Sequence, residues 1–445
     1  MGNKILKQFN FKSLMAFVSE TYLKNRTIVT SDIESIFSNI EEKTGINIVR
    51  HKFPTGSESS TWIVPKQWDV KEAWLKDKSG KIIASYKDHP LFVCIYSKGV
   101  HTTLSRKELC EHTYSEVKQP DAYAYNWRFA MDYKLQLKDW GISLPLNIIK
   151  ELKDDEYEIK IDIETKDGEM LIGEIEKKGQ TDNTIVFLSD YCHPGQVNDS
   201  YSGLIVFLKV MGELFKTGDT LFNYRMLMMP ETIGSAFYLT KNKDSLRNIK
   251  GAIFSEMVGW GDEWYIKKTR RGDTYLDLAT SDCQKRFPKL KTGSFYELIG
   301  NDEYMFDSIQ AGIPSISVQK NPFIEYHTSN DEPSKVDVNN LEFAESLILH
   351  IVYIIENDKI YKFKHTAPFW MTRFNLYADD QYEPEDFMVR LKIVYDLLDG
   401  KNSILDISDK LGVEFVDVKK FIDSIYENNL IIEVGHPLIC NEYRL

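Results

Sequence analysis

The sequence lacks paired cysteines and any apolar leader. Its five cysteines are scattered, and none stands in a C-x-x-C pair. An odd number of unpaired thiols is typical of a reducing compartment and argues against a disulfide framework. Polar residues interrupt the apolar ones near the N-terminus, unlike a signal peptide, and no apolar run approaches the length of a membrane span. We therefore expect a cytoplasmic protein that has no membrane partner.

The chain also has fewer basic than acidic residues. The chain has 55 Lys and Arg residues against 67 Asp and Glu residues, which gives a formal net charge of −12. This balance argues against general affinity for nucleic acid or anionic membranes, because both are polyanions. The sequence has neither an internal repeat nor a low-complexity tract, and its 445 residues predict two or three ordinary globular domains.

Three domains are predicted from the patterning of the chain. Apolar strands alternate with helical stretches after residue 155, so residues 1–48 and 155–375 are expected to form one discontinuous α/β domain. Tryptophans, tyrosines and β-branched runs predict an inserted β-rich domain over residues 49–154. Two helical runs and an apolar strand indicate a winged-helix domain over residues 385–445.

Short apolar strands of the α/β domain end at loops that carry polar groups. Segments 184–188, 224–229, 251–255 and 315–318 are apolar and bounded by turn residues. Strands of this kind are typical of a mostly parallel sheet that is covered by helices on both faces. In such sheets, ligands bind at the loops beyond the carboxyl ends of the strands. A binding site is therefore expected at that edge.

Four loops at this predicted edge supply candidate metal ligands and proton-transfer groups. His193 and Asp199 share the first loop, Glu231 lies in the second, Glu256 in the third and His327 in the fourth. Each residue alone has an ordinary interpretation: a helix cap for Asp199, a helix-dipole interaction for Glu231, a structural hydrogen bond for His327. Imidazole nitrogens and carboxylate oxygens are zinc ligands, so their coincidence favours a metal site.

In their order, these loops resemble the zinc exopeptidases of the aminopeptidase clan. That pattern has a histidine and an N-D-x-x-S-G-like loop, a glutamate before G-S, an acidic residue before M-x-G, an N-D-E loop before A-G-I-P, and finally Y-H-T-x-x-D. The chain supplies each in this order, at 193–203, 231–235, 256–259, 301–314 and 326–331.

A narrower resemblance covers nearly the whole chain. The chain is similar to a bacterial group of aminopeptidase-like proteins that carry an inserted N-terminal β domain of unknown function and a C-terminal winged helix. The shared motifs are T-W-x-V-P-x-x-W, C-H-P-x-x-x-N-D-x-x-S-G, T-I-G-S, R-R-G-D and N-D-E, at 61–68, 192–203, 232–235, 270–273 and 301–303. The resemblance implies an aminopeptidase-like (zinc exopeptidase, phosphorylase/hydrolase-like) fold, which is a mixed sheet flanked by helices.

The chain departs from the two-zinc pattern of that clan. Asp190 stands where the pattern has the histidine of His-x-Asp, Pro230-Glu231 replaces a Glu-Glu pair, and Glu256 replaces an aspartate. One glutamate cannot be both base and metal ligand. We therefore expect one zinc ion, with a second ion on Glu256 as the alternative and Glu231 as the catalytic base. The expected ligands of the single ion are His193, Asp199 and His327.

Zinc-dependent hydrolysis of an amide bond, of the aminopeptidase type, is the expected activity, with a peptide or a small amide as substrate. Candidates for holding substrate groups are Asp302, Glu303, Tyr326, Arg270 and Arg271. A solvated turn is the ordinary interpretation of the two arginines.

Two alternatives to the peptidase remain open. One is an amidase or deacylase of small molecules, for example of an amino sugar, or a glutaminyl-cyclase-like enzyme. The other is a non-catalytic, metal-binding regulatory protein that uses the winged helix. Residues 386–445 contain seven basic and eleven acidic residues, which argues against DNA binding by that domain. It is expected to pack on the catalytic domain or on a second subunit, which leaves a homo-oligomer open.

Overall fold

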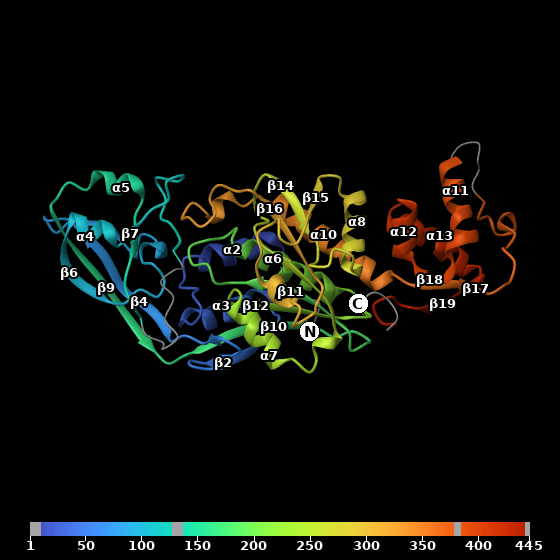
Figure 1. The fold of residues 1–445 in the computed structure, drawn as a ribbon, viewed down its shortest axis with the longest axis horizontal. Helices are drawn as coiled ribbons and strands as arrows, with labels where there is room; N and C mark the ends of the chain where they lie inside the picture. The colour runs from blue at the N-terminus through green and yellow to red at the C-terminus, as the bar shows by residue number, and fades with distance from the viewer. Residues whose placement is uncertain (1–9, 127–136, 378–383, 441–445) are drawn as a thin grey trace.

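The computed structural model describes residues 10–126, 137–377 and 384–440. Three groups of elements follow one another along the long axis of the molecule: a small sheet, a central sheet with helices, and a C-terminal group (Figure 1). Residues 1–9 and 441–445, at the outer ends of the predicted domains, lie outside the described residues.

The central sheet has eight strands and is mixed, as the sequence predicts. Its four inner strands β12, β11, β13 and β16 are parallel neighbours, and antiparallel strands flank them on both sides. The carboxyl ends of the four parallel strands therefore lie at one edge. In spatial order the strands are β1 (Val49–Pro54), β10 (Glu169–Lys177), β12 (Asn223–Met229), β11 (Thr184–Asp190), β13 (Ile249–Ser255), β16 (Ser315–Asn321), β14 (Glu263–Lys267) and β15 (Leu290–Gly293).

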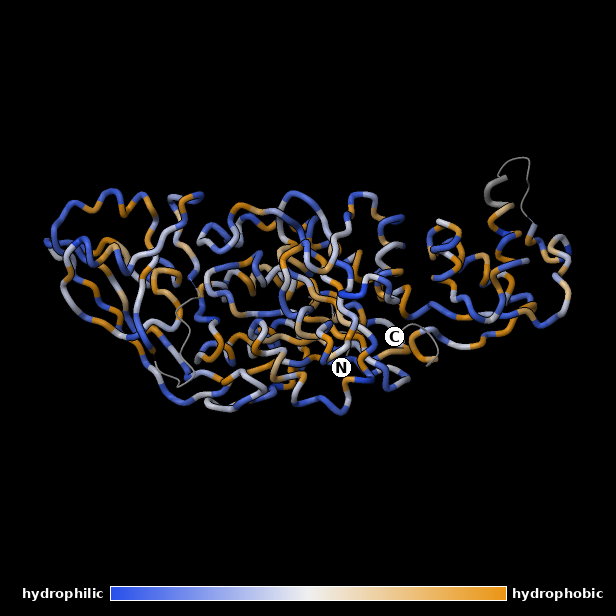
Figure 2. Tube along the Cα trace, in the orientation of Figure 1, coloured by the Kyte–Doolittle hydropathy of each residue, from blue (hydrophilic) through white to orange (hydrophobic). Residues whose placement is uncertain are grey.

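Helices cover both faces of this sheet, and strand β11 shows why. All its residues are buried, with Ile185 and Phe187 packed in one core and Val186 and Leu188 in another. Successive side chains of a strand point to opposite faces, so an unbroken apolar strand requires two apolar layers. One layer holds α2 (Phe11–Thr21), α3 (Asp32–Thr44), α6 (Tyr201–Lys216), α8 (Tyr275–Arg286) and α10 (Val338–Asn357), and the other holds α7 (Ile233–Lys241) and α9 (Asp302–Phe306). Figure 2 shows apolar stretches running through this middle part of the trace, as they do through the groups on either side.

Helix α10 qualifies the expectation that no segment approaches a membrane span. By length and composition alone, its 20 residues are apolar enough to cross a membrane. In the structure half of its most apolar window is buried, and Leu347, Ile351 and Ile354 are fully enclosed in the core. One face of α10 therefore packs in the core of the central domain, as expected for an amphipathic core helix.

The small sheet has its own apolar core around Trp68, Leu75 and Ile159. Its edges differ from the predicted range 49–154 by one strand at each end, because β1 pairs with the central sheet and β9 pairs with β4 and β6. Its strands, in order, are β5 (Ile82–Ser85), β4 (Gln67–Lys76), β9 (Glu156–Lys166) and β6 (Val100–Ser105). The shorter elements nearby are β2 (Glu58–Ser59), β3 (Trp62–Ile63), α4 (Arg106–Glu111), β7 (Thr113–Tyr114), β8 (Ile142–Ser143) and α5 (Leu146–Glu151).

The C-terminal group combines three helices with an antiparallel sheet of order β18-β17-β19. The sequence predicted two helical runs, whereas the structure has three helices in this group. It also predicted a turn at 400–403, where the structure has strand β18. Asp282 of α8 accepts hydrogen bonds from the Phe415 backbone N–H (2.7 Å) and the Ser408 hydroxyl (3.1 Å), so the group packs on the central domain. The winged helix itself stays a prediction. The elements are β17 (Ile360–Phe363), α11 (Pro384–Lys392), β18 (Asp399–Ser403), α12 (Ile404–Leu411), α13 (Phe415–Glu427) and β19 (Ile431–Gly435).

Candidate metal centre

The polar loops singled out in the sequence meet at the carboxyl edge of the parallel strands. Asp190, the last residue of β11, is in register with Met229, the last residue of β12. The loop after β11 carries His193 and Asp199, the loop after β12 carries Glu231, and the segment after β16 carries His327. Parallel neighbours end at a common edge, and this geometry brings loops distant in sequence together.

Two histidines and one carboxylate converge at this edge. The Nδ1 atom of His193 lies 3.5 Å from Asp199 Oδ1, and the Nε2 atom of His327 lies 3.2 Å from Asp199 Oδ2. One ligand atom from each of the three residues lies within 4.8 Å of the other two. Burial opposes ionisation of the Asp199 carboxyl, but the two imidazoles outweigh burial and lower its pKa. The carboxylate between them is thus ionised, and the arrangement suits a cation.

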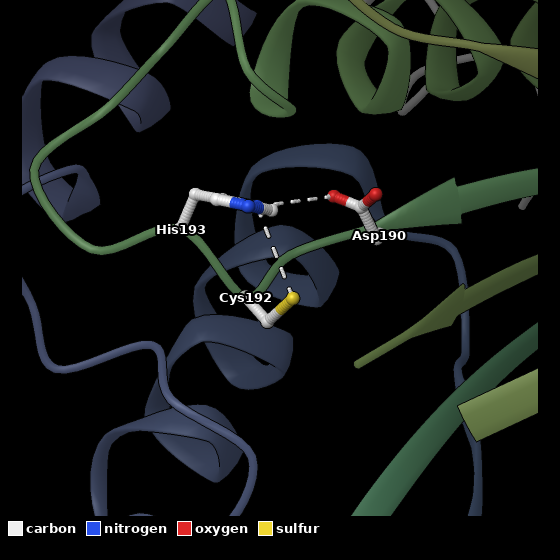
Figure 3. A group of neighbouring side chains, drawn as sticks. All are labelled: Asp190, Cys192 and His193. Carbon is white, nitrogen blue, oxygen red and sulfur yellow. Dashed lines mark hydrogen bonds and ion pairs between the residues drawn. The ribbon is translucent and has the colours of Figure 1, made fainter. Parts of the chain in front are cut away.

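A second group of ligand atoms shares His193 with the first and consists of Asp190, Cys192 and His193 (Figure 3). The Nδ1 atom of His193 lies 3.9 Å from both the Cys192 Sγ and an Asp190 oxygen. Burial, together with the charges of Asp190 and Glu231, raises the pKa of the Cys192 thiol well above its usual value. Its sulfur already accepts a hydrogen bond from the Glu231 N–H (3.2 Å). Because metals bind the thiolate, this group is the poorer cation site.

Glu231 lies beside the two-histidine group. Its Oε2 atom is 3.5 Å from His193 Nε2, and its side chain keeps 35 % of its exposure, so it is accessible from the cavity. Partial burial, followed by the charges of Asp199 and Asp302, raises its pKa to about 8. A carboxyl group with a pKa near neutrality can both accept and return a proton at physiological pH. Thr232, the next residue, has a positive φ of 58°.

A third set of side chains joins two buried carboxyl groups through one amide. The Asn301 Nδ2 atom donates to Asp190 Oδ2 at 3.1 Å and to Glu256 Oε2 at 3.0 Å. Among the described residues, the other oxygen of each carboxyl group has no hydrogen-bond partner. Burial, followed by the charges of neighbouring acids, raises the pKa of both well above the usual range. We name the two acids Asp190 and Glu256, with Asn301 between them, the amide-bridged pair.

A buried arginine, Arg26, holds the loop that carries His193 through hydrogen bonds to its backbone. The guanidinium of Arg26 donates to the backbone carbonyls of Tyr191 (2.7 Å), His193 and Gln196 (2.6 Å). It also lies 3.7 Å from the centre of the Tyr201 ring, and its side chain is fully buried. Arg26 was not predicted as a site residue, because a single arginine 165 positions before the loop carries no sequence signal.

The Asp199 end of the same loop is held by Asp331. Its carboxylate accepts three backbone hydrogen bonds, from Val197 (2.9 Å), Asn198 (2.6 Å) and Asp199 (3.1 Å). Asp331 is the aspartate of the Y-H-T-x-x-D motif, so the motif places one candidate ligand, His327, and the anchor of another, Asp199, on one segment. Groups that orient a metal ligand in this way commonly matter almost as much as the ligand itself.

The predicted substrate-binding acids lie behind the cavity wall. Asp302 is fully buried and accepts hydrogen bonds from the Thr232 N–H (2.9 Å) and the Ser235 hydroxyl (2.7 Å). Glu303 forms an ion pair with Lys267 in which both side chains are fully buried. Neither acid is among the residues that line the cavity in the described part of the chain. Asp302 thereby supports the loop after β12, whereas Glu303 accepts a hydrogen bond from the Asn301 N–H (3.2 Å) in its own loop.

The predicted arginines are engaged elsewhere. The Arg270 Nε atom donates to the Asp307 carbonyl (2.7 Å), and the Arg271 Nε atom lies 3.1 Å from Asp273. Neither arginine lines the described cavity. Tyr326, in contrast, does line it, and its ring stacks on the His327 ring at a centroid distance of 3.8 Å.

A cavity of about 480 Å³ opens onto the candidate metal-binding groups. His193, Asp199, Glu231, Glu256 and His327 all line it, and no lysine or arginine does so within the described ranges. The described part of residues 55–166, which holds β2 to β9 and which we name the small-sheet unit, supplies part of the wall, which the sequence did not predict. Its contributions are Trp62, Ile95, Tyr96 and Tyr125.

With this geometry established, comparison with known proteins identifies the family. A family model described as a domain of unknown function, DUF4910, matches residues 15–358. The chain belongs to this family. A protein of Clostridium acetobutylicum, named "Putative polysaccharide biosynthesis protein with aminopeptidase-like domain", is 29% identical over 426 residues, covering 93% of this chain and 94% of that protein.

Solved structures extend the comparison. A crystal structure of a "putative peptidase" from C. acetobutylicum matches with a TM-score of 0.83 at 28% identity, covering 97% of this DUF4910 chain and 99% of that one. A zinc aminopeptidase from Bacillus subtilis matches with a TM-score of 0.54 at 16% identity, covering 78% and 94%. An M28 peptidase precursor from Shewanella amazonensis gives 0.55 at 12% identity, covering 79% and 95%. The predicted aminopeptidase-like fold of the central domain is thereby confirmed.

Proposed function

We propose that this protein is a zinc-dependent hydrolase of amide bonds, of the aminopeptidase type. The observation that carries the proposal is the convergence of His193, Asp199 and His327 within 4.8 Å at the carboxyl edge of an aminopeptidase-like sheet. Two imidazoles and a carboxylate are ligands that zinc accepts in tetrahedral sites, and three protein ligands leave a position for substrate or water. The fold shared with a zinc aminopeptidase supports the same choice of metal.

Zinc at this position would polarise the scissile carbonyl and make water a stronger acid. Glu231 then acts as the base. It is accessible from the cavity, lies 3.5 Å from His193, and has a carboxyl pKa raised to about 8 by partial burial and by neighbouring acids. It takes a proton from the attacking water and returns it to the leaving amine, because amide hydrolysis requires both transfers.

A single ion is the form that the side chains favour. A second ion would require Asp190 and Glu256 as ligands, together with Asp199. In the amide-bridged pair, the Asn301 Nδ2 atom already donates to both of those carboxyl groups, at 3.1 and 3.0 Å. Two ions, with Glu256 as a ligand of the second, remain the alternative.

The main alternative is hydrolysis of a small amide, for example deacylation of an amino sugar. The observation that favours it is the name of the C. acetobutylicum relative, which refers to polysaccharide biosynthesis.

A metal-binding regulatory protein without activity would bind zinc and hydrolyse nothing. The acidic C-terminal group and the net charge of −12 support a protein that does not bind nucleic acid or membranes.

Metal content separates the two candidate ligand groups, because both contain His193 but only one contains His327 and only the other contains Cys192. We expect about one zinc per chain in the wild-type protein and in Cys192→Ser, and none in His327→Ala. The measurement is elemental analysis after dialysis, followed by hydrolysis assays on panels of aminoacyl and N-acyl amides.

The opposite pattern, with metal retained in His327→Ala and lost in Cys192→Ser, would refute the assignment of the ligands. A wild-type protein that binds zinc and hydrolyses neither panel would instead support the regulatory alternative. Preference for N-acyl amides over aminoacyl amides would select the deacylase.

A further inference from the structure

The backbone of His327 adopts a conformation that residues other than glycine seldom take. Its φ angle is 57°, in the left-handed region, where a β-carbon is crowded by the neighbouring carbonyl. Such a conformation is costly and persists only where the surrounding structure enforces it. With this backbone, the Nε2 atom of His327 lies 3.2 Å from Asp199 Oδ2. The contacts that enforce the backbone conformation therefore also position a candidate metal ligand.

The central domain supplies few of these contacts. The Thr328 N–H donates to the Glu325 carbonyl (3.0 Å) and the Asp331 N–H to the Thr328 carbonyl (3.1 Å), which are local turns. The backbone of His327 itself makes one hydrogen bond within the described ranges, which its carbonyl accepts from the Tyr125 N–H (2.8 Å). Tyr125 belongs to the small-sheet unit. The bond that holds the His327 backbone thus comes from outside the central domain.

That bond is one rung of a short antiparallel ladder between residues 327–330 and residues 119–125. The next rung is the hydrogen bond from the Ser329 N–H to the Tyr123 carbonyl (2.8 Å), and a β-bridge lies between the two rungs. The Tyr123 N–H also donates to the Ser329 hydroxyl (3.0 Å). Two rungs fix both the position and the direction of the backbone that carries the His327 ring.

The 119–125 segment is in turn attached to both parts of the molecule. Its Ala124 N–H donates to the Ser143 hydroxyl (2.6 Å), and Ser143 lies in β8 and is fully buried. At its other end, the Oε1 atom of Gln119 accepts a hydrogen bond from the Asn330 side-chain amide (2.6 Å). Ser143 therefore connects the ladder to the core of the small-sheet unit, and Gln119 closes the ladder against the His327 segment.

The small-sheet unit also contacts the loop that carries His193. A β-carbon at Gly195 in that loop would overlap the ring of His89, so the two are packed so closely that only glycine fits. The His89 ring also stacks on Tyr123, with 5.8 Å between the ring centroids and 9° between the planes. One unit therefore packs against both loops that supply the imidazoles of the candidate metal centre.

We propose that the small-sheet unit completes the candidate metal centre by holding His327 in its ligand conformation, with Ser143 and Gln119 as positioning residues. The inference rests on the proposed zinc site. Without the ladder, the His327 backbone can leave the left-handed region and carry the imidazole away from Asp199. The unit thus controls metal binding without contributing a ligand.

Ser143→Ala tests the attachment of the ladder to the core. We expect zinc affinity, measured by competition with a chelating dye, to fall about tenfold, the lower end of what groups behind a metal ligand contribute. Ser105→Ala is the control, because it removes the hydroxyl that caps α4 in the same unit, away from the ladder. The control should melt at a lower temperature, as loss of a helix cap predicts, and bind zinc as tightly as the wild type.

Two substitutions of Gln119 keep the test decisive if Ser143→Ala does not fold. Gln119→Ala removes the acceptor for the Asn330 amide, whereas the carboxylate of Gln119→Glu retains it. We expect Gln119→Ala to bind zinc more weakly than the wild type and Gln119→Glu to bind it at least as tightly. A purely structural role would give no such rescue.

A measurement on the metal-free protein is independent of zinc. Hydrogen exchange of the Tyr125 and Ser329 amides reports opening of the ladder, and both amides donate to carbonyls rather than to Ser143. We expect the two amides to exchange about tenfold faster in Ser143→Ala than in Ser105→Ala, because the loss of an attachment makes local opening easier.

Wild-type zinc affinity in both Ser143→Ala and Gln119→Ala, or equal exchange of the two amides in Ser143→Ala and Ser105→Ala, would overturn the role of the small-sheet unit. Failure of the proposed function looks different: the wild type then binds no zinc, while exchange of the two amides still depends on Ser143.

Discussion

Two carboxylate clusters lie side by side at the edge of the sheet and are built on opposite principles. Asp199 lies between two imidazoles, which lower its pKa despite burial. Asp190 and Glu256 share a single amide hydrogen-bond donor, and burial and the charges of neighbouring acids raise their pKa values. The first cluster is prepared to bind a cation, and the second is prepared to hold protons.

The difference shows how one sheet edge can carry several acids without several metal ions. Like charges that approach closely are costly in a buried site unless a cation or a proton neutralises them. Asn301 contributes a neutral donor where a metal would otherwise be needed. The variants below test whether the two clusters have these separate roles.

Glu231→Gln should have the largest effect, on the catalytic side of the comparison. The amide cannot accept a proton, so we expect turnover to fall at least about a hundredfold while zinc is retained. Activity and elemental analysis are measured on the same sample, with Glu169→Gln on the surface of β10 as the matched control. Loss of zinc from Glu231→Gln would make Glu231 a ligand, and the base would then have to be sought at Glu256 or Glu303.

Asn301→Asp should convert the second cluster into a cation site. It brings a third carboxylate next to Asp190 and Glu256, and mutual repulsion then favours a bound cation. We expect zinc stoichiometry to rise from about one to about two per chain in zinc excess, and the metal-free variant to melt at a lower temperature than the wild type. Asn339→Asp, exposed at the start of α10, is the control. Unchanged stoichiometry together with unchanged melting would count against the neutral-donor role of Asn301.

Arg26→Met should affect the first cluster indirectly. The substitution removes the donors to three carbonyls of the His193 loop, so we expect about tenfold weaker zinc affinity, the lower end of what outer-shell groups contribute. Competition with a chelating dye measures it. Arg50→Met, which removes an ion pair with Glu41 away from the loop, should leave zinc affinity unchanged. If both variants lose affinity equally, the effect is one of general stability.

The pH dependence of the metal-free protein should show the smallest effect. Burial raises the pKa of Glu231 to about 8 and that of Asp302 and Asp331 to about 7. A raised carboxyl pKa means that the folded state binds more protons than the unfolded state, so stability falls as pH rises through these values. We expect the urea midpoint to fall between pH 6.5 and pH 8. Above pH 6.5 His193, whose pKa is lowered to about 4, is neutral in both states and adds little.

Asp190→Asn sharpens this last measurement, because it removes one of the raised carboxyl groups from the amide-bridged pair. The decline of stability with pH should then be shallower than in the wild type. A decline as steep as that of the wild type would mean that Asp190 does not hold a proton in the metal-free protein.

The sequence was informative where chemistry follows directly from strand ends. His193, Asp199, Glu231 and His327 could be singled out because each follows a buried strand, and the structure brings them together. Strand assignments such as 184–188 and 224–229 were confirmed for the same reason: unbroken apolar runs leave few alternatives to a buried sheet.

What the sequence could not predict depends on contacts between distant segments. Tyr125 and Arg26 have no local pattern that distinguishes them from other tyrosines and arginines. The partners of Arg270 and Glu303, which are Asp307 and Lys267, likewise become evident only when the loops are placed in space. Composition and periodicity indicate which residues are buried, and they do not indicate which buried polar residues meet.

The anchoring of the His193 loop by Arg26 has a consequence for how the protein matures. The guanidinium is synthesised 165 residues before the first carbonyl it holds, and His327 follows much later still. Contacts between such distant segments close late, since the entropy of a long loop must be overcome before they contribute. If His193, Asp199 and His327 hold zinc as proposed, a nascent chain that ends before His327 lacks one of the three ligands, so tight zinc binding requires synthesis beyond residue 327. An ion that binds only the folded state stabilises that state. Zinc binding would therefore come last and would stabilise a chain that has already folded.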